Sequence, residues 1–224
     1  MKKLEIYGDS ILRGVMYCPE TGRYDLCRKN RFAPLAEYGI EAKNNARMGA
    51  TIDRGFELLK RNLANGAEDT LVLLEFGGND CDFHWADVSA NPDGQFQPNT
   101  PMDRFTQTYG EMIRFVREKG GTPVIASLVP IDAEKYMNWI TRNLNYQNIL
   151  RWLGDVSMLS RWQEYYSHLA ERLAYEHHCP LLDLRRSFLL THDYRDMICE
   201  DGIHPTLRGH DLIDREIFAF CANS

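Results

Sequence analysis

Two short segments at opposite ends of the chain carry residue types that covalent acyl transfer requires. Gly8-Asp9-Ser10 offers a serine nucleophile, and Asp201-Gly202-Ile203-His204-Pro205 offers a carboxylate and an imidazole three residues apart. A serine hydroxyl is a weak nucleophile at neutral pH, so it needs a neighbouring base, and that base needs a group to orient it. Ser10, His204 and Asp201 therefore form a candidate catalytic set.

Two further segments could complete such a site. Gly77-Gly78-Asn79-Asp80 follows the most apolar run of the chain, and the amide of Asn79 could donate a hydrogen bond to an oxyanion. Gly49 could offer a backbone N–H beside it. Each segment alone is also typical of ordinary structure, since Asp and Ser cap helices and paired glycines form tight turns. It is the combination of these segments that predicts a catalytic site.

Metal and cofactor chemistry is not expected. His204 and His210 lie close in the sequence, but their spacing does not match a helical pair of metal ligands. No turn rich in Gly, Ser or Thr that could cradle a phosphate follows the first apolar run, which argues against a bound flavin. We therefore predict neither a metal nor a flavin.

Apolar runs alternate with amphipathic helical stretches along the chain. Strands are expected at residues 4–7, 39–43, 70–76, 122–128 and 180–184. This alternation predicts an α/β fold, a three-layer α/β/α sandwich around a doubly wound, parallel, five-stranded sheet. The candidate residues all fall just after strands, so they are expected to meet at one edge of the sheet. We expect one domain over residues 1–224.

Smaller features of the helices are also predicted. Thr51 is expected to cap the helix that carries Phe56, and Pro205 to begin the final helix. Trp162 and Tyr165 share a spacing that is typical of a buried helical face. Two excursions interrupt the alternation, a long loop at about 81–102 and a helical segment at about 129–160. Both follow strands, where α/β folds place ligand sites, so we expect them to shape the substrate site.

Composition limits the functional classes. The 224 residues have a net charge of −6 with interleaved charges, and this argues against a nucleic-acid partner. No apolar stretch approaches the roughly 20 residues of a membrane span. The six cysteines are scattered and no secretory signal is evident, so reduced thiols and a cytoplasmic location are expected. The oligomeric state is left open.

Taken together, these segments closely resemble the SGNH (GDSL-type) hydrolases. The resemblance covers Gly8-Asp9-Ser10, Gly49, Gly77-Gly78-Asn79-Asp80 and the Asp201/His204 segment, with isoleucine where leucine usually follows the serine. It implies a flavodoxin-like α/β/α fold and cleavage of acyl esters or thioesters without a cofactor. It further implies that Ser10 is the nucleophile, His204 the base and Asp201 its orienting group. The implied oxyanion hole consists of the N–H groups of Ser10 and Gly49 and the side chain of Asn79.

The substrate is less sharply indicated, because residues 81–160 match no subfamily pattern. The excursions are rich in aromatic side chains: Trp85, Phe96, Tyr136, Trp139, Tyr146 and Trp152. Such rings stack on sugars, line apolar acyl pockets or form ordinary core. The hypothesis we favour is an esterase that acts on a small-molecule acyl ester, with a carbohydrate acetylesterase preferred over a long-chain lipase as its specific form. The alternatives are an acyltransferase with the same triad, a lysophospholipase or thioesterase, and a non-catalytic ligand-binding module.

Overall fold

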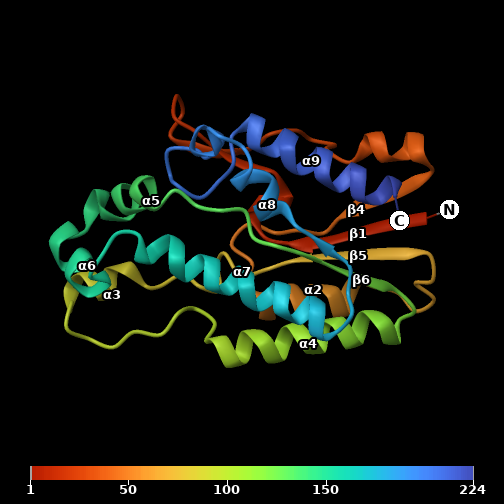
Figure 1. Ribbon diagram of the computed structural model, residues 1–224, viewed down its shortest axis with the longest axis horizontal. Coiled ribbons are helices and arrows are strands. Elements are labelled where there is room, and N and C mark those ends of the chain that lie inside the picture. The colour runs from red at the N-terminus through yellow and green to blue at the C-terminus, as the bar shows by residue number, and fades with distance from the viewer. Residues whose placement is uncertain (1, 224) are drawn as a thin grey trace.

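A computed structural model describes residues 2–223 of the chain and places a parallel five-stranded sheet at its centre (Figure 1). The strand order is β4-β1-β5-β6-β7, which confirms the predicted fold class. The observed strands agree closely with the apolar runs of the sequence, although the last is only two residues long. Their bounds are β1 Lys2–Gly8, β4 Ile40–Asn44, β5 Thr70–Glu75, β6 Thr122–Ala126 and β7 Leu181–Leu182.

The strand register brings the carboxyl ends of the central strands together. Ile6 of β1 pairs with Asn44, and Gly8 pairs with Glu75. The segments that follow β1, β4 and β5 therefore leave the sheet at the same edge. This edge is where Ser10, Gly49 and Asn79 are found.

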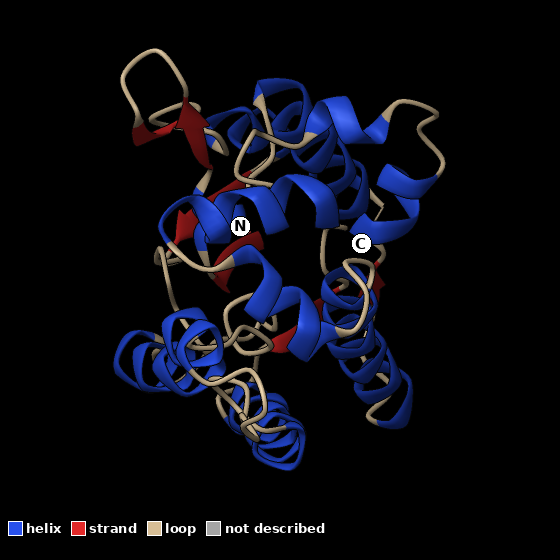
Figure 2. Cartoon of the chain, turned by 90° about the vertical axis from the view of Figure 1, so that its left-hand side faces the viewer, coloured by secondary structure: helices blue, strands red, loops and turns tan. Residues whose placement is uncertain are grey.

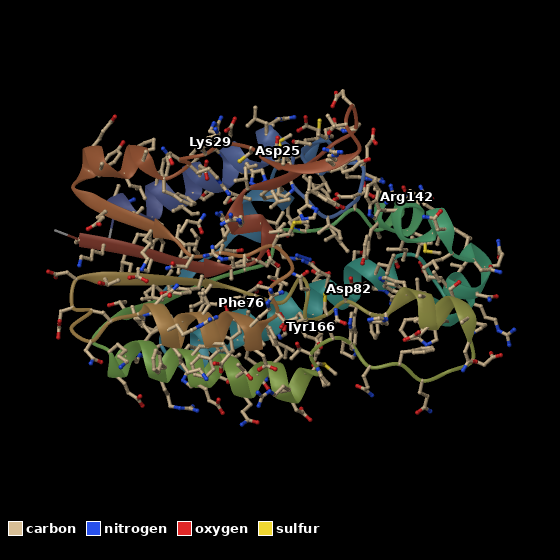
Figure 3. All side chains as sticks on the ribbon, turned by 180° about the vertical axis from the view of Figure 1, so that it is seen from behind. Asp25, Lys29, Phe76, Asp82, Arg142 and Tyr166 are labelled. Carbon is tan, nitrogen blue, oxygen red and sulfur yellow. The ribbon has the colours of Figure 1, made fainter. Side chains whose placement is uncertain are left out.

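Helices cover both faces of the sheet because alternate strand residues are buried on opposite sides. Tyr7 and Leu74 pack with one layer, whereas Ile6 and Leu73 pack with the other. The first layer contains α2 (Ile52–Asn62), α4 (Met102–Glu118) and α7 (Met158–Glu176). The second contains α1 (Ser10–Arg13), the 3-10 helix η1 (Ala33–Tyr38), α8 (Leu184–Leu189) and α9 (Leu207–Ala222). Figure 3 shows Phe76, after β5, and Tyr166, on α7, together in the first layer.

The two excursions meet beyond the carboxyl ends of the strands, at the end of the molecule opposite the termini (Figure 1). They contain α3 (Trp85–Ala90), α5 (Ala133–Ile140), the 3-10 helix η2 (Thr141–Asn143) and α6 (Tyr146–Leu153). The segment 81–102 is therefore not a plain loop, because it includes α3. Its Trp85 packs with residues of α5 and α6 in a third apolar cluster, separate from the two that flank the sheet.

A small antiparallel hairpin was not predicted from the sequence. It consists of β2 (Val15–Cys18) and β3 (Arg23–Leu26) and projects from the body of the molecule (Figure 2, upper left). All four residues of β3 are exposed, so this strand lacks the apolar signal that marks the sheet. A further 3-10 helix, η3 (Tyr194–Met197), precedes the Asp201/His204 segment.

Three smaller predictions are wrong. Thr51 occupies the N-cap position of α2 without a capping bond from its side chain, and Oδ1 of Asp80 accepts the N–H of Ile52 instead. Helix α9 begins at Leu207 with Thr206 as its N-cap, so Pro205 lies outside it. Tyr165 is 45% exposed and therefore not core. All six cysteines are free, and no helix within residues 2–223 is long and apolar enough to cross a membrane.

Candidate active site

Ser10 is the first residue of α1, directly after the end of β1. Asp9 is the N-cap, and its Oδ1 accepts the N–H of Ile11 at 2.9 Å. The helix is only one turn long and ends at Gly14, whose left-handed backbone (φ 88°) suits a residue without a Cβ. The capping role of Gly8-Asp9-Ser10 is therefore real, and it places the Ser10 hydroxyl at the edge of the sheet.

The structure brings Ser10, His204 and Asp201 together. Oγ of Ser10 lies 2.9 Å from Nε2 of His204, and Nδ1 of His204 lies 2.6 Å from Oδ2 of Asp201. Asp201 is fully buried. Burial acts to raise the pKa of Asp201, but the hydrogen bond and charge of His204 and two backbone N–H groups outweigh it, so the pKa lies below its ordinary value. Asp201 is thus the ionised partner of the imidazole.

The loop that carries this pair is fixed from several directions. Oδ1 of Asp201 accepts the backbone N–H groups of Ile203 and His204, both at 3.1 Å. Gly202 has a φ of 77°, and a Cβ there would lie 2.2 Å from the backbone nitrogen of Tyr136 on α5. Its carbonyl accepts the N–H of Asp132 at 2.9 Å. The second excursion therefore packs against the loop that carries His204 and holds it in place.

Tyr24 is a neighbour of the site that sequence reasoning missed. It projects from the β2–β3 hairpin, and its ring centroid lies 5.0 Å from that of His204. Burial and the charge of Asp201 raise the pKa of the Tyr24 phenol, which is accordingly neutral. The hairpin thus brings Tyr24 against the histidine by tertiary packing, which local sequence cannot reveal.

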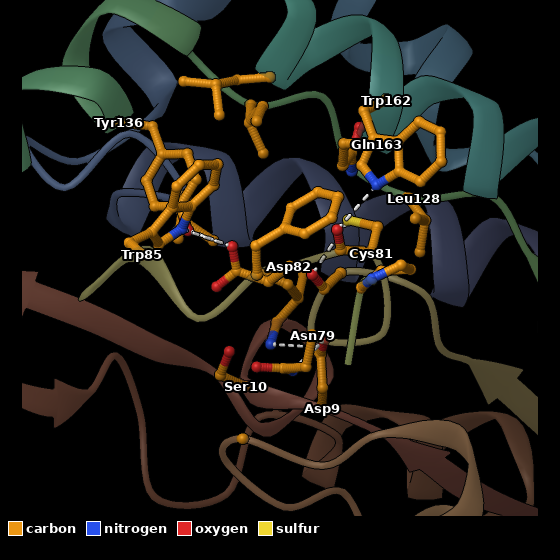
Figure 4. Close-up of a pocket in the computed structure, with 18 of the residues that line it drawn as sticks. Asp9, Ser10, Asn79, Cys81, Asp82, Trp85, Leu128, Tyr136, Trp162 and Gln163 are labelled. Carbon is orange, nitrogen blue, oxygen red and sulfur yellow. Dashed lines mark hydrogen bonds between the residues drawn. The ribbon is translucent and has the colours of Figure 1, made fainter. Parts of the chain in front are cut away.

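The three predicted oxyanion donors line one cavity with His204. Gly49 has a φ of 69°, a left-handed conformation that favours glycine. The amide nitrogen of Asn79 donates to Oδ2 of Asp9 at 3.0 Å and to the carbonyl of Ala50 at 3.3 Å (Figure 4). Asn79 therefore already has acceptors in this structure, and the bond to Ala50 is the longer of the two.

A pair of buried carboxyl groups lies next to the serine. Glu75, the last residue of β5, lies beside Asp9, and its Oε2 has no hydrogen-bond donor among the described residues. Burial and the charge of Asp9 raise the pKa of Glu75 well above its ordinary value. Burial also raises the pKa of Asp9, although the N–H of Ile11 opposes this. A proton on Glu75 leaves a single negative charge on the pair and so relieves the repulsion between the two carboxyl groups.

The cavity at the site has a volume of about 530 Å³. Ser10 and His204 lie at one end of its lining, and both excursions supply much of the remainder, including Trp85 and Trp152. Figure 4 shows Ser10 and Asp9 on one side and Trp85, Tyr136 and Trp162 on the other. Trp162 was expected to be core; it is half-buried against the first-layer core and also lines this cavity, because the N-terminal part of α7 extends beyond the sheet (Figure 1).

The other histidine near the site has a structural role. Nε2 of His210, on α9, donates to the carbonyl of Val15 at 2.9 Å. Burial lowers the pKa of His210 to about 3, so its ring is neutral. Within residues 2–223, no group of three His, Cys, Asp or Glu side chains is arranged to hold a metal ion.

The fold is that of a three-layer α/β hydrolase with a Ser/His/Asp arrangement at the carboxyl edge of its sheet. A family model described as the GDSL-like lipase/acylhydrolase family matches residues 6–212. The chain therefore belongs to this family and is a carboxylic ester hydrolase. A comparison with curated protein sequences finds no match.

Solved structures of other hydrolases have a similar fold. A lipase/acylhydrolase from Enterococcus faecalis is 16% identical, with a TM-score of 0.63 over 100% of this chain and 96% of that one. LAE5, an alpha/beta hydrolase enzyme from the metagenome of Lake Arreo, is 22% identical, with a TM-score of 0.64 over 100% and 97%. Axe2, an acetylxylan esterase from Geobacillus stearothermophilus, is 17% identical, with a TM-score of 0.63 over 97% and 93%. At these identities the similarity shows the fold.

Proposed function

We propose that this protein hydrolyses acyl esters through an acyl-serine intermediate on Ser10. The observation that carries the proposal is the continuous chain of short contacts from Ser10 through His204 to Asp201, at 2.9 and 2.6 Å. These distances lie within the range expected of a nucleophile, its base and the orienting group.

The geometry supports a two-step mechanism. His204 accepts the Ser10 proton at Nε2 as Oγ attacks the ester carbonyl, and Asp201 stabilises the resulting imidazolium through Nδ1. His204 then donates that proton to the leaving alcohol. Water, activated by the same imidazole, attacks the acyl-serine and releases the acid. No metal or organic cofactor enters these steps.

The proposed oxyanion hole consists of the backbone N–H groups of Ser10 and Gly49 and the Asn79 amide. The presence of all three residues in the lining of one cavity supports it. When a tetrahedral intermediate forms, the N–H of Asn79 that lies 3.3 Å from the Ala50 carbonyl turns to the oxyanion. The bond to Asp9 is retained, because a charged acceptor makes the stronger hydrogen bond.

We propose that the excursions at 81–102 and 129–160 shape the substrate site, because both supply part of the cavity lining. An acetylated carbohydrate has the support of one observation, the name of Axe2 as an acetylxylan esterase, and it competes with esters of larger acids. An acyltransferase, a lysophospholipase or thioesterase and a binding module are the competing functions. Transfer products formed with added acceptor alcohols would identify a transferase.

Labelling with a fluorophosphonate probe tests the proposal. The expected result is a single adduct on Ser10 that is lost in Ser10→Ala and His204→Ala, both of which stay folded. The absence of an adduct on folded wild-type protein would overturn the proposed mechanism and favour a binding module.

A further inference from the structure

We propose that the acyl group of the substrate is an apolar group much larger than acetyl and that it is held inside the cavity between the two excursions. This inference rests on the proposed hydrolysis at Ser10 and adds the chemical class of the acid. The cavity volume of about 530 Å³ is within the range of roughly 300–1,000 Å³ that encloses whole small ligands. An acetyl group would leave most of it empty.

The cavity extends from the catalytic residues into the third apolar cluster. Trp85, Ile131 and Leu159 belong both to that cluster and to the cavity lining. Leu128 and Val129 line it on the side of the sheet. An acyl chain that starts at Ser10 would therefore run along aliphatic and aromatic side chains, where burial of methylene groups is favourable.

The polar atoms of the lining aromatics are already hydrogen-bonded to the protein. Nε1 of Trp85 donates to Oδ1 of Asp82 at 2.8 Å, and the Tyr136 hydroxyl donates to the same oxygen at 2.7 Å (Figure 4). Nε1 of Trp162 donates to the carbonyl of Cys81 at 2.9 Å. These groups, which would otherwise recognise sugar hydroxyls, face their protein partners.

The polar atoms of the Gln163 side chain are also hydrogen-bonded to the protein. Its amide nitrogen donates to the carbonyl of Val129 at 2.9 Å, and its oxygen accepts from the guanidinium of Arg185 at 3.1 Å. A hydroxyl buried against the four side chains Trp85, Tyr136, Trp162 and Gln163 would meet polar atoms that already have partners, which is unfavourable. This part of the lining therefore favours an apolar acyl group over a carbohydrate.

The aromatic rings also pack against one another. The ring of Trp152 meets Phe83 at 4.9 Å, Phe96 at 5.7 Å and Trp85 at 6.2 Å, in each case edge to face. These edge-to-face contacts pack part of each ring against another ring. They form a wall suited to an alkyl or aryl group.

Hydrolysis of p-nitrophenyl esters of increasing acyl length tests the inference. We expect kcat/KM for the octanoate to exceed that for the acetate at least about 100-fold, since each methylene in an apolar pocket discriminates by about tenfold or more. Equal or better turnover of the acetate would overturn the inference and leave the proposed hydrolysis at Ser10 intact.

Two matched substitutions locate the effect. Met158 lines the cavity and is half-buried, so Met158→Trp should fill it and reduce the octanoate-to-acetate ratio at least about tenfold, by removing room for the added methylenes. Met16 is also half-buried but lies on β2, away from the cavity lining, so Met16→Trp should leave the ratio unchanged. An unchanged ratio in a folded Met158→Trp protein would contradict the assignment of the cavity.

Binding to the Ser10→Ala protein separates this inference from the proposed mechanism. We expect isothermal titration to detect octanoate but not acetate at the same concentration. Octanoate binding together with a wild-type protein that turns over no ester would support the cavity assignment and overturn the hydrolysis. The absence of octanoate binding to folded protein would overturn the cavity assignment.

Discussion

The side-chain amide of Asn79 donates a hydrogen bond to Oδ2 of Asp9 over 3.0 Å. The proposed oxyanion donor is therefore held by the residue that directly precedes the proposed nucleophile. The other oxygen of Asp9 caps α1 through the N–H of Ile11. One carboxylate thus positions both Ser10 and Asn79.

Replacing Asp9 by Asn should misplace the oxyanion donor. Oδ1 can still accept from Ile11, but the new NH2 group faces that of Asn79, and two donors cannot bond. Loss of an oxyanion donor lowers kcat by about 10²–10³-fold. Asn79→Ala should show this full loss, and the loss of kcat in Asp9→Asn should approach it. Steady-state kinetics with a small ester should show a lower kcat and little change in KM.

Glu75→Gln is the matched control for that substitution. Glutamine is neutral, as the protonated carboxyl of Glu75 is, so Asp9 should keep its charge and its bond to Asn79, and activity should stay close to that of the wild type. Equal losses in Glu75→Gln and Asp9→Asn would show that burial of the pair, rather than the orientation of Asn79, is what matters.

Asp201→Asn should preserve the loop and abolish most of the activity. The Asn oxygen can accept the N–H groups of Ile203 and His204, but the amide would donate to Nδ1 and place the ring proton on Nε2, which faces Ser10. In serine hydrolases that tautomer lowers kcat by about 10⁴. A folded Asp201→Asn enzyme with kcat within tenfold of the wild type would remove the orienting role of Asp201.

Gly202→Ala should impair both stability and activity. A left-handed backbone costs a residue with a Cβ about 1–2 kcal/mol, and here the Cβ would also strike α5 at Tyr136. Gly154 is a matched control, because its φ of 76° is almost the same and a Cβ there meets nothing within 4 Å. The thermal unfolding temperature should fall in both variants, whereas kcat should fall only in Gly202→Ala. Equal kcat values would show that α5 does not hold the His204 loop in place.

Asp80 should make the free energy of unfolding depend on pH in the acid range. Burial raises its pKa from 3.8 to about 6, so the folded protein holds a proton there that the unfolded chain releases at a lower pH. The stability associated with this proton is complete below about pH 4 and is lost as the pH rises to about 6, by up to about 1.4 kcal/mol per pH unit. Asp80→Asn removes the titration and keeps an oxygen for Ile52. Denaturant unfolding from pH 4 to 7 should show the wild type losing stability relative to Asp80→Asn, and a constant difference would contradict the shift.

Much of the sheet and of the candidate site could be predicted from the sequence because both depend on local patterns. The central strands are apolar runs, as at 70–76, and parallel pairing places the residues that follow them at one edge. Asp201 and His204 are three residues apart, so their contact needs only a turn. Ser10, Gly49 and Asn79 are brought to the same cavity by the register of β1, β4 and β5.

The rest depends on contacts between distant segments that leave no local pattern. Tyr24 reaches His204 from a strand with no buried residue, and Glu75 meets Asp9 across two strands. Trp162 has the spacing of a core residue, but its end of α7 lies past the sheet. The capping of α2 by Asp80 instead of Thr51 likewise follows from the path of the loop after β5.

Mass spectrometry of the rapidly quenched enzyme during ester turnover tests the central claim most directly. The account predicts an acyl group on the peptide that contains Ser10, formed and lost at rates consistent with kcat and absent from Ser10→Ala. Steady turnover without any acylated peptide, with full activity retained in Ser10→Ala, would contradict it.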